Sequence, residues 1–165
     1  MDLGTGTETM ILIAHRGNLT GAMPGRENTP EYIDNAIKLG FDVEVDVWGI
    51  EGKLWLGHDK GVKSISTGYL HDYFDRLWVH CKNLEAISII REHAPFIRHF
   101  WHQRDDYTMV SNGLVWCYPG KQPPTKHGIV VLPELLMTMD SIKDYWQQGV
   151  YGICSDFVGV LKDHK

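Results

Sequence analysis

The stretch from Phe41 to Trp48 constrains the fold of this chain more than any other. Its sequence, FDVEVDVW, alternates, so an extended strand carries three valines on one face and three carboxylates on the other. Clustered carboxylates repel one another unless positive charge lies between them. The carboxylate face is therefore either a solvated strand face or a cation site built from oxygen ligands. The valines favour a strand held in a core, so we expect Asp42, Glu44 and Asp46 to face an enclosed space.

The composition is that of a soluble globular domain. The 165 residues are 43% hydrophobic and 22% charged, which predicts one domain with a substantial core. A formal net charge of −5 provides no basic surface, so no nucleic-acid partner is expected. The sequence has no signal-peptide pattern and no apolar run near the roughly 20 residues of a membrane span. We interpret residues 1–9, which are small and polar, as a leader or expression remnant before a single domain at 10–165.

The cysteine pattern indicates a reducing compartment. Cys81, Cys117 and Cys154 each lie in an apolar or aromatic run, and their odd number leaves no complete disulfide framework. Buried reduced thiols are expected, and with them a cytoplasmic location.

Strand and helix patterns alternate along the chain. Strands are predicted at 10–14, 41–48, 53–56, 77–82, 97–102, 114–118, 129–132 and 150–154, and helices at 30–39, after Asn83 and at 141–148. Thr29 is the expected cap of the first helix, with Pro30 at its first position. The polar links after residue 102 are too short to hold a helix each. This order predicts an α/β fold, a reduced TIM-type (β/α) barrel with some crossover helices missing.

Polar residues gather where the predicted strands end, at His15, Arg16, Glu44, Asp46, Lys82, His102, Tyr118, Glu134 and Asp156, with His58 added by the 53–56 hairpin. In an α/β barrel this rim carries the active site. Carboxylates that hold a metal, two histidines and two cationic side chains suit phosphodiester cleavage. The metal and the cations hold the phosphate, and the histidines exchange protons with the nucleophile and the leaving group.

Four ordered motifs in the first half of the chain resemble those of one family. They are His15-Arg16-Gly17, Glu27-Asn28-Thr29, Glu44-Val45-Asp46 and Gly57-His58-Asp59. The chain thus resembles the glycerophosphodiester phosphodiesterases of the phospholipase-C-like barrel superfamily, whose closing strand is also similar to residues 152–156. Four motifs in order are a specific signal, whereas any one of them alone is weak.

The resemblance implies a role for each of these positions. His15 and His58 would be the general acid and base, and Arg16 would bind the phosphate. A divalent cation, Mg²⁺ or Ca²⁺, would be held by Glu27, Glu44 and Asp46.

The third predicted buried strand departs from the family pattern. The family carries a metal-binding Glu two residues before a Lys, and here His80 stands in that place before Lys82. His80 is either a ligand or a hydrogen-bonded core histidine, and Lys82 either contacts the substrate or pairs with Glu44 or Asp46. Asp59 either orients His58 or caps its turn. Further rim candidates, for which a structural role is the default, are His102, Tyr118, Glu134 and Asp156.

The preferred hypothesis is a metal-dependent phosphodiesterase that acts on a small-molecule phosphodiester. Its nucleophile is either water or a hydroxyl of the substrate, and the latter yields a cyclic phosphate. The alternative is a degenerate barrel that binds a phosphorylated ligand without cleaving it, suggested by His80 and the missing helices. A metal-free lyase related to bacterial phosphoinositide phospholipases leaves the acidic cluster unexplained.

Overall fold

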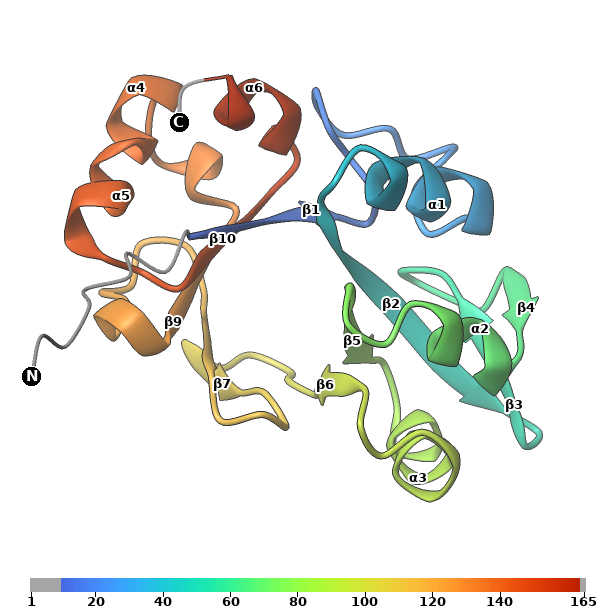
Figure 1. The fold of residues 1–165 in the computed structure, drawn as a ribbon. Helices are drawn as coiled ribbons and strands as arrows, with labels where there is room; N and C mark the ends of the chain where they lie inside the picture. The colour runs from blue at the N-terminus through green and yellow to red at the C-terminus, as the bar shows by residue number, and fades with distance from the viewer. Residues whose placement is uncertain (1–9, 164–165) are drawn as a thin grey trace, which may run out of the picture.

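The computed structural model describes residues 10–163, which form a curled, barrel-like sheet with helices outside it (Figure 1). The interpretation of residues 1–9 as a leader lies outside the described residues. The strands that run parallel to one another follow the spatial order β6-β5-β2-β1-β10-β9-β8. Their bounds are β1 (Ile11–His15), β2 (Asp42–Ile50), β5 (Leu77–Cys81), β6 (Arg98–Phe100), β8 (Val115–Cys117), β9 (Gly128–Val131) and β10 (Gly152–Ser155).

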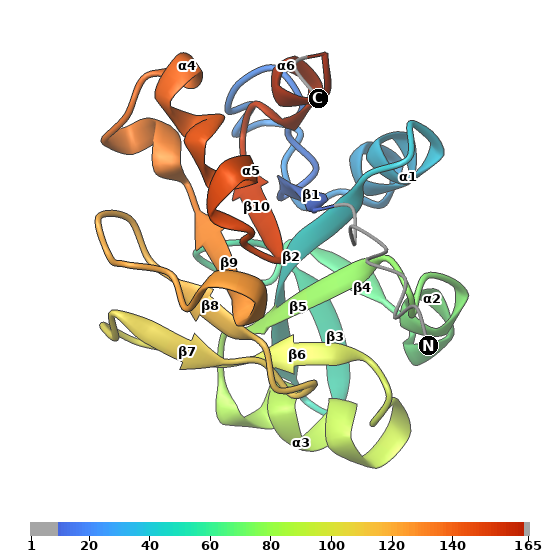
Figure 2. The ribbon, with the colours of Figure 1, turned by 60° about the vertical axis from the view of Figure 1, so that its left-hand side comes forward.

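Antiparallel strands extend the sheet at two places. The predicted hairpin is present: β3 (Lys53–Leu56) returns along β2, and β4 (Lys63–Ile65) then pairs with β3. β7 (Tyr107–Met109) pairs with β8, which ends the parallel strand order. The turn after β7 meets β6, because the Ser111 N–H donates to the carbonyl of His99 over 2.9 Å. This contact joins the two ends of the parallel strand order (Figure 2).

The helices lie outside the curled sheet, in the links between strands and after the last strand (Figures 1 and 2). They are α1 (Pro30–Lys38), α2 (Thr67–Asp72), α3 (Leu84–His93), α4 (Met139–Ile142), α5 (Asp144–Gln148) and α6 (Val158–Lys162). Within residues 10–163, the links from β6 to β8 and from β8 to β9 contain no α-helix, only β7 and the 3₁₀ turn η1 (Thr125–His127). The predicted α/β class and the predicted lack of helices in these links are confirmed.

Several short elements differ from the sequence prediction. The segment between β3 and β5, predicted as a loop, contains β4 and α2. The helix predicted at 141–148 is divided into α4 and α5, which meet at Lys143. Thr29 is the N-cap residue of α1, but its hydroxyl donates to the carbonyl of Arg26 rather than capping the helix. β4, α2, α4 and α5 are too short for their apolar period to stand out in the sequence.

The alternation in β2 separates two apolar clusters. Val43, Val45 and Val47 point outward and pack against the helices. A second cluster fills the inside of the curled sheet and includes Trp78, Phe100, Trp116, Ile129 and Cys154. All three cysteines are buried free thiols, as predicted.

Asp42 lies apart from the other two carboxylates of β2. It accepts hydrogen bonds from the indole of Trp78 over 2.9 Å and from the guanidinium of Arg98 over 3.2 Å. The Arg98 guanidinium also lies 4.1 Å from the centre of the Trp78 ring. Asp42 is therefore paired at the start of β2, and only Glu44 and Asp46 reach the rim. None of the helices in the described part of the chain combines the length and apolar character needed to cross a membrane.

Candidate active site

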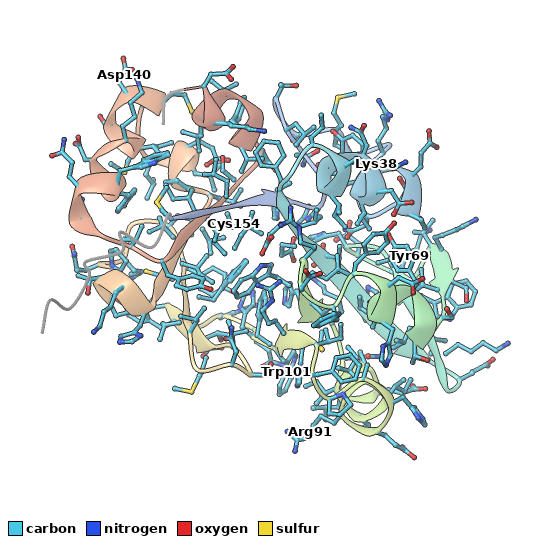
Figure 3. All side chains as sticks on the ribbon, viewed as in Figure 1. Lys38, Tyr69, Arg91, Trp101, Asp140 and Cys154 are labelled. Carbon is cyan, nitrogen blue, oxygen red and sulfur yellow. The ribbon has the colours of Figure 1, made fainter. Side chains whose placement is uncertain are left out.

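The carboxyl ends of the parallel strands surround a cavity of about 310 Å³. Side chains crowd the inside of the curled sheet, whereas Lys38, Arg91 and Asp140 lie at its periphery (Figure 3). The residues that line the cavity include His15, Arg16, Glu44, Asp46, His58, His80, Lys82, His102 and Tyr118. The structure thus brings together most of the predicted rim residues. Asp156 and Glu134 lie behind this lining, and Glu27 lines a neighbouring groove instead.

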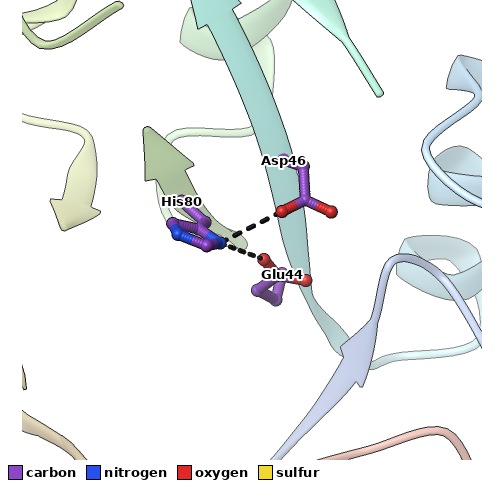
Figure 4. Close-up of side chains that lie close together, drawn as sticks. All are labelled: Glu44, Asp46 and His80. Carbon is purple, nitrogen blue, oxygen red and sulfur yellow. Dashed lines mark ion pairs between the residues drawn. The ribbon is translucent and has the colours of Figure 1, made fainter. Parts of the chain in front are cut away.

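Glu44, Asp46 and His80 form a compact cluster in this cavity (Figure 4). His80 Nδ1 lies 3.0 Å from Asp46 Oδ1 and 3.8 Å from Glu44 Oε1. One ligand atom from each residue lies within 4.8 Å of the other two. Both carboxylates are buried, with exposed fractions of 2% and 1%. The structure therefore places His80 beside both carboxylates, a position compatible with either of the two roles considered for it.

Positive groups and an amide surround Asp46. Lys82 Nζ lies 3.2 Å from Asp46 Oδ1, and Arg16 Nε lies 3.0 Å from Asp46 Oδ2. The Asn28 side chain donates to Asp46 Oδ2 and accepts from the Asp46 N–H, both over 2.9 Å. Burial alone would raise the pKa of Asp46, but the His80 imidazole, Lys82 and Arg16 hold it well below its usual range. Of the two roles considered for Lys82, the structure shows the salt bridge.

Glu44 has the opposite electrostatic environment. Burial, together with the charge of Asp46, raises the pKa of Glu44, although His15, His80 and Arg16 oppose this shift. The backbone N–H of Arg16 donates to Glu44 Oε2 over 3.3 Å, and His15 Nε2 lies 3.9 Å from the same oxygen. Negative charge at Glu44 is thus less fully compensated than at Asp46, which favours a further positive group beside it.

Glu27 lies outside this cluster. Its Oε2 accepts from Arg16 Nη1 over 3.2 Å, and its Oε1 accepts from Asn18 Nδ2 over 2.9 Å and from the Met23 N–H over 3.1 Å. The structure therefore shows Glu27 as a partner that positions Arg16. Its predicted role as a metal ligand stays a prediction.

Two non-glycine residues of the site have left-handed backbones. Arg16 has φ +54° and Asn28 has φ +55°, a region that few non-glycine residues occupy. The Asn28 N–H donates to the Arg16 carbonyl over 3.2 Å, and the Arg16 N–H donates to the Glu44 carbonyl over 2.9 Å. These contacts hold the strained loop against β2. Such strain persists where the surrounding structure enforces it, often at functional sites.

His15 is held by a carboxylate from the end of the chain. Its Nδ1 donates to Asp156 Oδ1 over 2.8 Å, and Asn18 Nδ2 donates to the same oxygen over 2.8 Å. Burial lowers the pKa of His15, but the hydrogen bond to Asp156 and the charge of Glu44 outweigh burial, and the net shift is upward. Glu134 supports this end of β10, because its Oε1 accepts from the Asp156 N–H and the Ser155 hydroxyl.

His58 stands at the mouth of the cavity. Its Nδ1 donates to Asp59 Oδ1 over 2.7 Å, and its side chain is 45% exposed. This contact agrees with the orienting role considered for Asp59. His58 also borders a groove of about 250 Å³ that Lys60 and Lys63 help to line. Each predicted proton-transfer histidine therefore has its own carboxylate on Nδ1, which leaves Nε2 for chemistry.

Aromatic rings continue the cavity wall from His80. The His80 ring stacks on Phe100 and on His102, with centroids 5.0 and 4.8 Å apart, and His102 lies 4.2 Å from the Tyr118 ring. His102 Nδ1 and the Tyr118 hydroxyl are buried and have no hydrogen-bond partner in residues 10–163. Burial, with the charges of His80 and Lys82, lowers the pKa of His102 to about 4. Burial raises the pKa of Tyr118, so both side chains are neutral at pH 7.

Asn18 and Asn28 are the supporting residues that sequence reasoning missed. Both are buried, and they bind the carboxylates of Asp156 and Asp46 respectively. Their positions in the sequence could have indicated this role, because Asn18 directly follows His-Arg-Gly and Asn28 is the middle residue of Glu-Asn-Thr.

Comparison with known proteins identifies similar folds rather than close relatives. No protein-family model matches the sequence, and no curated protein matches it significantly. A putative glycerophosphodiester phosphodiesterase from Galdieria sulphuraria is 10% identical over 97% of this chain and 99% of its own, with a TM-score of 0.52. A glycerophosphodiester phosphodiesterase from Parabacteroides distasonis ATCC 8503 is 11% identical over 96% of this chain and 98% of its own, with a TM-score of 0.53. The chain therefore has the fold of these two structures along almost its whole length.

Proposed function

We propose that this protein is a metal-dependent phosphodiesterase, built on a reduced TIM-type barrel, that cleaves a small-molecule phosphodiester. The observation that carries the proposal is the pair of histidines, His15 and His58. Each is oriented through Nδ1 by a carboxylate, and both line the cavity that holds Glu44 and Asp46. A site that only binds phosphate has no need of two oriented proton-transfer groups. The fold shared with two glycerophosphodiester phosphodiesterases supports the same reaction class.

The residues of the cluster fit a divalent cation. Asp46 Oδ1 is buried and accepts no hydrogen bond within residues 10–163, although His80 and Lys82 lie near it. Carboxylate oxygens are the ligands that divalent cations share most widely, so Glu44 and Asp46 would hold the ion. Bound there, the cation would supply positive charge to a phosphate oxygen.

The remaining groups bind the phosphate and move protons. Arg16 and Lys82 both line the cavity, and their positive charges favour a phosphate there. His15 keeps Nε2 toward the cluster, 3.9 Å from Glu44 Oε2. We assign proton removal from the nucleophile to one histidine and protonation of the leaving oxygen to the other.

The aromatic wall suggests which part of the substrate lies on the His80 side of the cavity. His102 and Tyr118 each present a neutral polar atom with no partner among the described residues. Neutral groups that both donate and accept hydrogen bonds suit hydroxyls better than a charged head group. We propose that an ester arm with free hydroxyls contacts this wall, which a glycerophosphodiester would satisfy.

One observation favours the binding-only alternative. Lys82 and His80 already lie within 3.2 Å of the same Asp46 oxygen, so much of its charge is compensated without a metal. A barrel that binds a phosphorylated ligand through Arg16 and Lys82, without turnover, is the second candidate.

Phosphorus NMR on a panel of glycerophosphodiesters, with different divalent cations and with chelator, separates the two functions. We expect metal-dependent loss of a diester signal in the wild type and none in His15→Ala, His58→Ala or Glu44→Gln. His127→Asn is the matched control, because His127 is exposed and does not line the cavity. A monoester product would identify water as the nucleophile, and a cyclic phosphate a substrate hydroxyl. Tight phosphate binding without turnover under any cation would favour the second candidate.

A further inference from the structure

The cluster at the centre of the site contains nitrogen as well as oxygen donors, which changes the cation it should prefer. The resemblance implied Glu27, Glu44 and Asp46 as ligands, with a further Glu at the position of His80. In the structure His80 lies beside Glu44 and Asp46, and Glu27 is held by Arg16 and Asn18. We propose that His80 binds the metal directly and that the site selects a later first-row transition-metal dication, such as Zn²⁺ or Co²⁺, over Mg²⁺ and Ca²⁺. This inference rests on the proposed function and replaces the Mg²⁺ or Ca²⁺ that the resemblance implied.

The backbone places His80 in the cluster. In the parallel pairing of β2 with β5, Asp46 is the register partner of His80. Both side chains point to the inner face, and Nδ1 of His80 lies 3.0 Å from Asp46 Oδ1 and 3.8 Å from Glu44 Oε1. The two neighbouring strands thus present three donor atoms on the same face. A metal ion could bind all three without a large movement of the backbone.

The His80 ring is also fixed in orientation. It stacks on Phe100 at an interplanar angle of 8° and on His102 at 20° (centroid distances 5.0 and 4.8 Å). These contacts restrict rotation of the ring while Nδ1 faces the carboxylates (Figure 4). A ligand whose rotamer is already set by packing loses less freedom when it binds a metal.

The net negative charge around the cluster favours binding of a dication. The carboxylates of Glu27, Glu44, Asp46 and Asp156 carry four negative charges around the cluster, and Arg16 and Lys82 carry two positive charges. With neutral histidines, these six groups have a formal net charge of two negative units. Lys82 shares Asp46 Oδ1 through a flexible side chain that can move aside.

The donor types then decide the class of metal. Mg²⁺ and Ca²⁺ are held almost entirely by oxygen ligands. Imidazole nitrogen suits the later first-row metals such as Zn²⁺, whereas carboxylate and water ligands suit Mn²⁺ as well as Mg²⁺ and Ca²⁺. One imidazole with two carboxylates therefore favours a transition metal, with affinities expected to rise from Mn²⁺ to Co²⁺ and Zn²⁺.

Calorimetric titration of the full chain with each metal chloride tests the preference. We expect the wild type to bind Zn²⁺ or Co²⁺ at least about tenfold more tightly than Mg²⁺, and His80→Glu to reduce that ratio by about tenfold or more. His127→Asn, which changes an exposed histidine outside the cavity lining, should leave the ratio unchanged. Equal ratios in the wild type and His80→Glu would overturn the proposal.

Pulsed EPR of the Mn²⁺-loaded protein tests the ligand itself. We expect a nitrogen coupling in the wild type that changes on ¹⁵N-histidine labelling and disappears in His80→Glu. No nitrogen coupling in the wild type would overturn the proposal, as would a coupling that persists in His80→Glu, because another histidine would then be the ligand. Circular dichroism checks that the variant folds, and His80→Gln replaces it if it does not.

These readouts do not depend on turnover, so they separate this inference from the proposed function. A nitrogen-ligated metal in a protein that cleaves no diester would support the inference and contradict the proposed phosphodiesterase. Turnover with Mg²⁺, without any nitrogen coupling in the Mn²⁺ form, would overturn the inference and leave the phosphodiesterase standing.

Discussion

His15 Nδ1 lies 2.8 Å from Asp156 Oδ1, although 141 positions separate the two residues in the sequence. β1 and β10 are neighbours in the sheet, and their register pairs Ala14 with Ser155. The two residues that follow these partners therefore meet at the same rim. Asp156 orients the imidazole and raises the pKa of His15 against the effect of burial.

Replacing Asp156 with Asn should lower the pKa of His15. The Asn oxygen can still accept from Nδ1, but the negative charge that favours the imidazolium is lost. Whichever limb of the pH–rate profile belongs to His15 should therefore move to lower pH. The maximal rate should fall by less than the roughly 10²–10⁴-fold expected for His15→Ala. The test is the rate of diester cleavage between pH 5 and pH 9.

The control for this variant is Asp163→Asn, which removes an exposed carboxylate near the end of the described chain. It should leave both limbs in place. A profile for Asp156→Asn that keeps both limbs or shifts one upward would contradict the role given to Asp156.

The sequence predicted the parallel strands and the gathering of polar groups at their ends because both depend on local pattern. The alternation in residues 42–48 fixes which face each β2 side chain occupies, and the structure follows it. The parallel strands of an α/β barrel end at one rim, so the sequence pattern alone predicts that His15, Glu44 and Lys82 lie together, and all three line the cavity.

Contacts between distant segments could not be predicted in the same way. Asp42 has the same alternation as Glu44, but it pairs with Arg98 because β6 lies beside β5, and the sequence does not reveal that partner. Glu27 accepts a hydrogen bond from Arg16, whose backbone has φ +54°, and the sequence reveals neither this contact nor this conformation. Short elements such as β4 and β7 carry too few residues for a period to be counted.

Asn28 should be important for stability as well as for the site. Its side chain makes two buried hydrogen bonds with Asp46, and its backbone has φ +55°. We expect Asn28→Ala to lower the free energy of unfolding by about 2–4 kcal/mol, since it leaves buried polar groups unpaired. Asn28→Gly loses the same hydrogen bonds but tolerates the left-handed backbone, so it should be about 1 kcal/mol more stable than Asn28→Ala. Urea denaturation measures both, and equal stability of the two variants would exclude backbone strain at this position.

Glu134 should give the protein a pH-dependent stability. Burial, with the nearby charge of Asp156, raises the pKa of Glu134 above its usual 4.5, although hydrogen bonds from Ser155 and from backbone N–H groups oppose the shift. Because its pKa is raised in the folded state, Glu134 contributes fully to the free energy of unfolding below pH 4.5. This contribution is lost as the pH rises through the folded-state pKa. Glu134→Gln keeps an oxygen acceptor for the Ser155 hydroxyl but does not titrate. Its stability relative to the wild type should therefore increase between pH 4 and pH 7.5 in urea denaturation, whereas a constant difference would contradict the raised pKa.

The pairing of Asp42 with Arg98 should stabilise the fold without contributing to the chemistry. Asp42 accepts from Trp78 and Arg98 at the start of β2, outside the residues that line the cavity. Asp42→Ala leaves the largely buried Arg98 guanidinium without its carboxylate, so unfolding should become easier by about 3–5 kcal/mol. Asp42→Leu combined with Arg98→Met removes both charges of the pair. Arg76, 3.6 Å from Asp42 Oδ1, also loses this carboxylate but is one-third exposed, so the double variant should be more stable than Asp42→Ala. Thermal and urea denaturation measure the three proteins, and the turnover of each folded variant should match that of the wild type. A loss below about 1 kcal/mol in Asp42→Ala would show that the pair is only weakly stabilising.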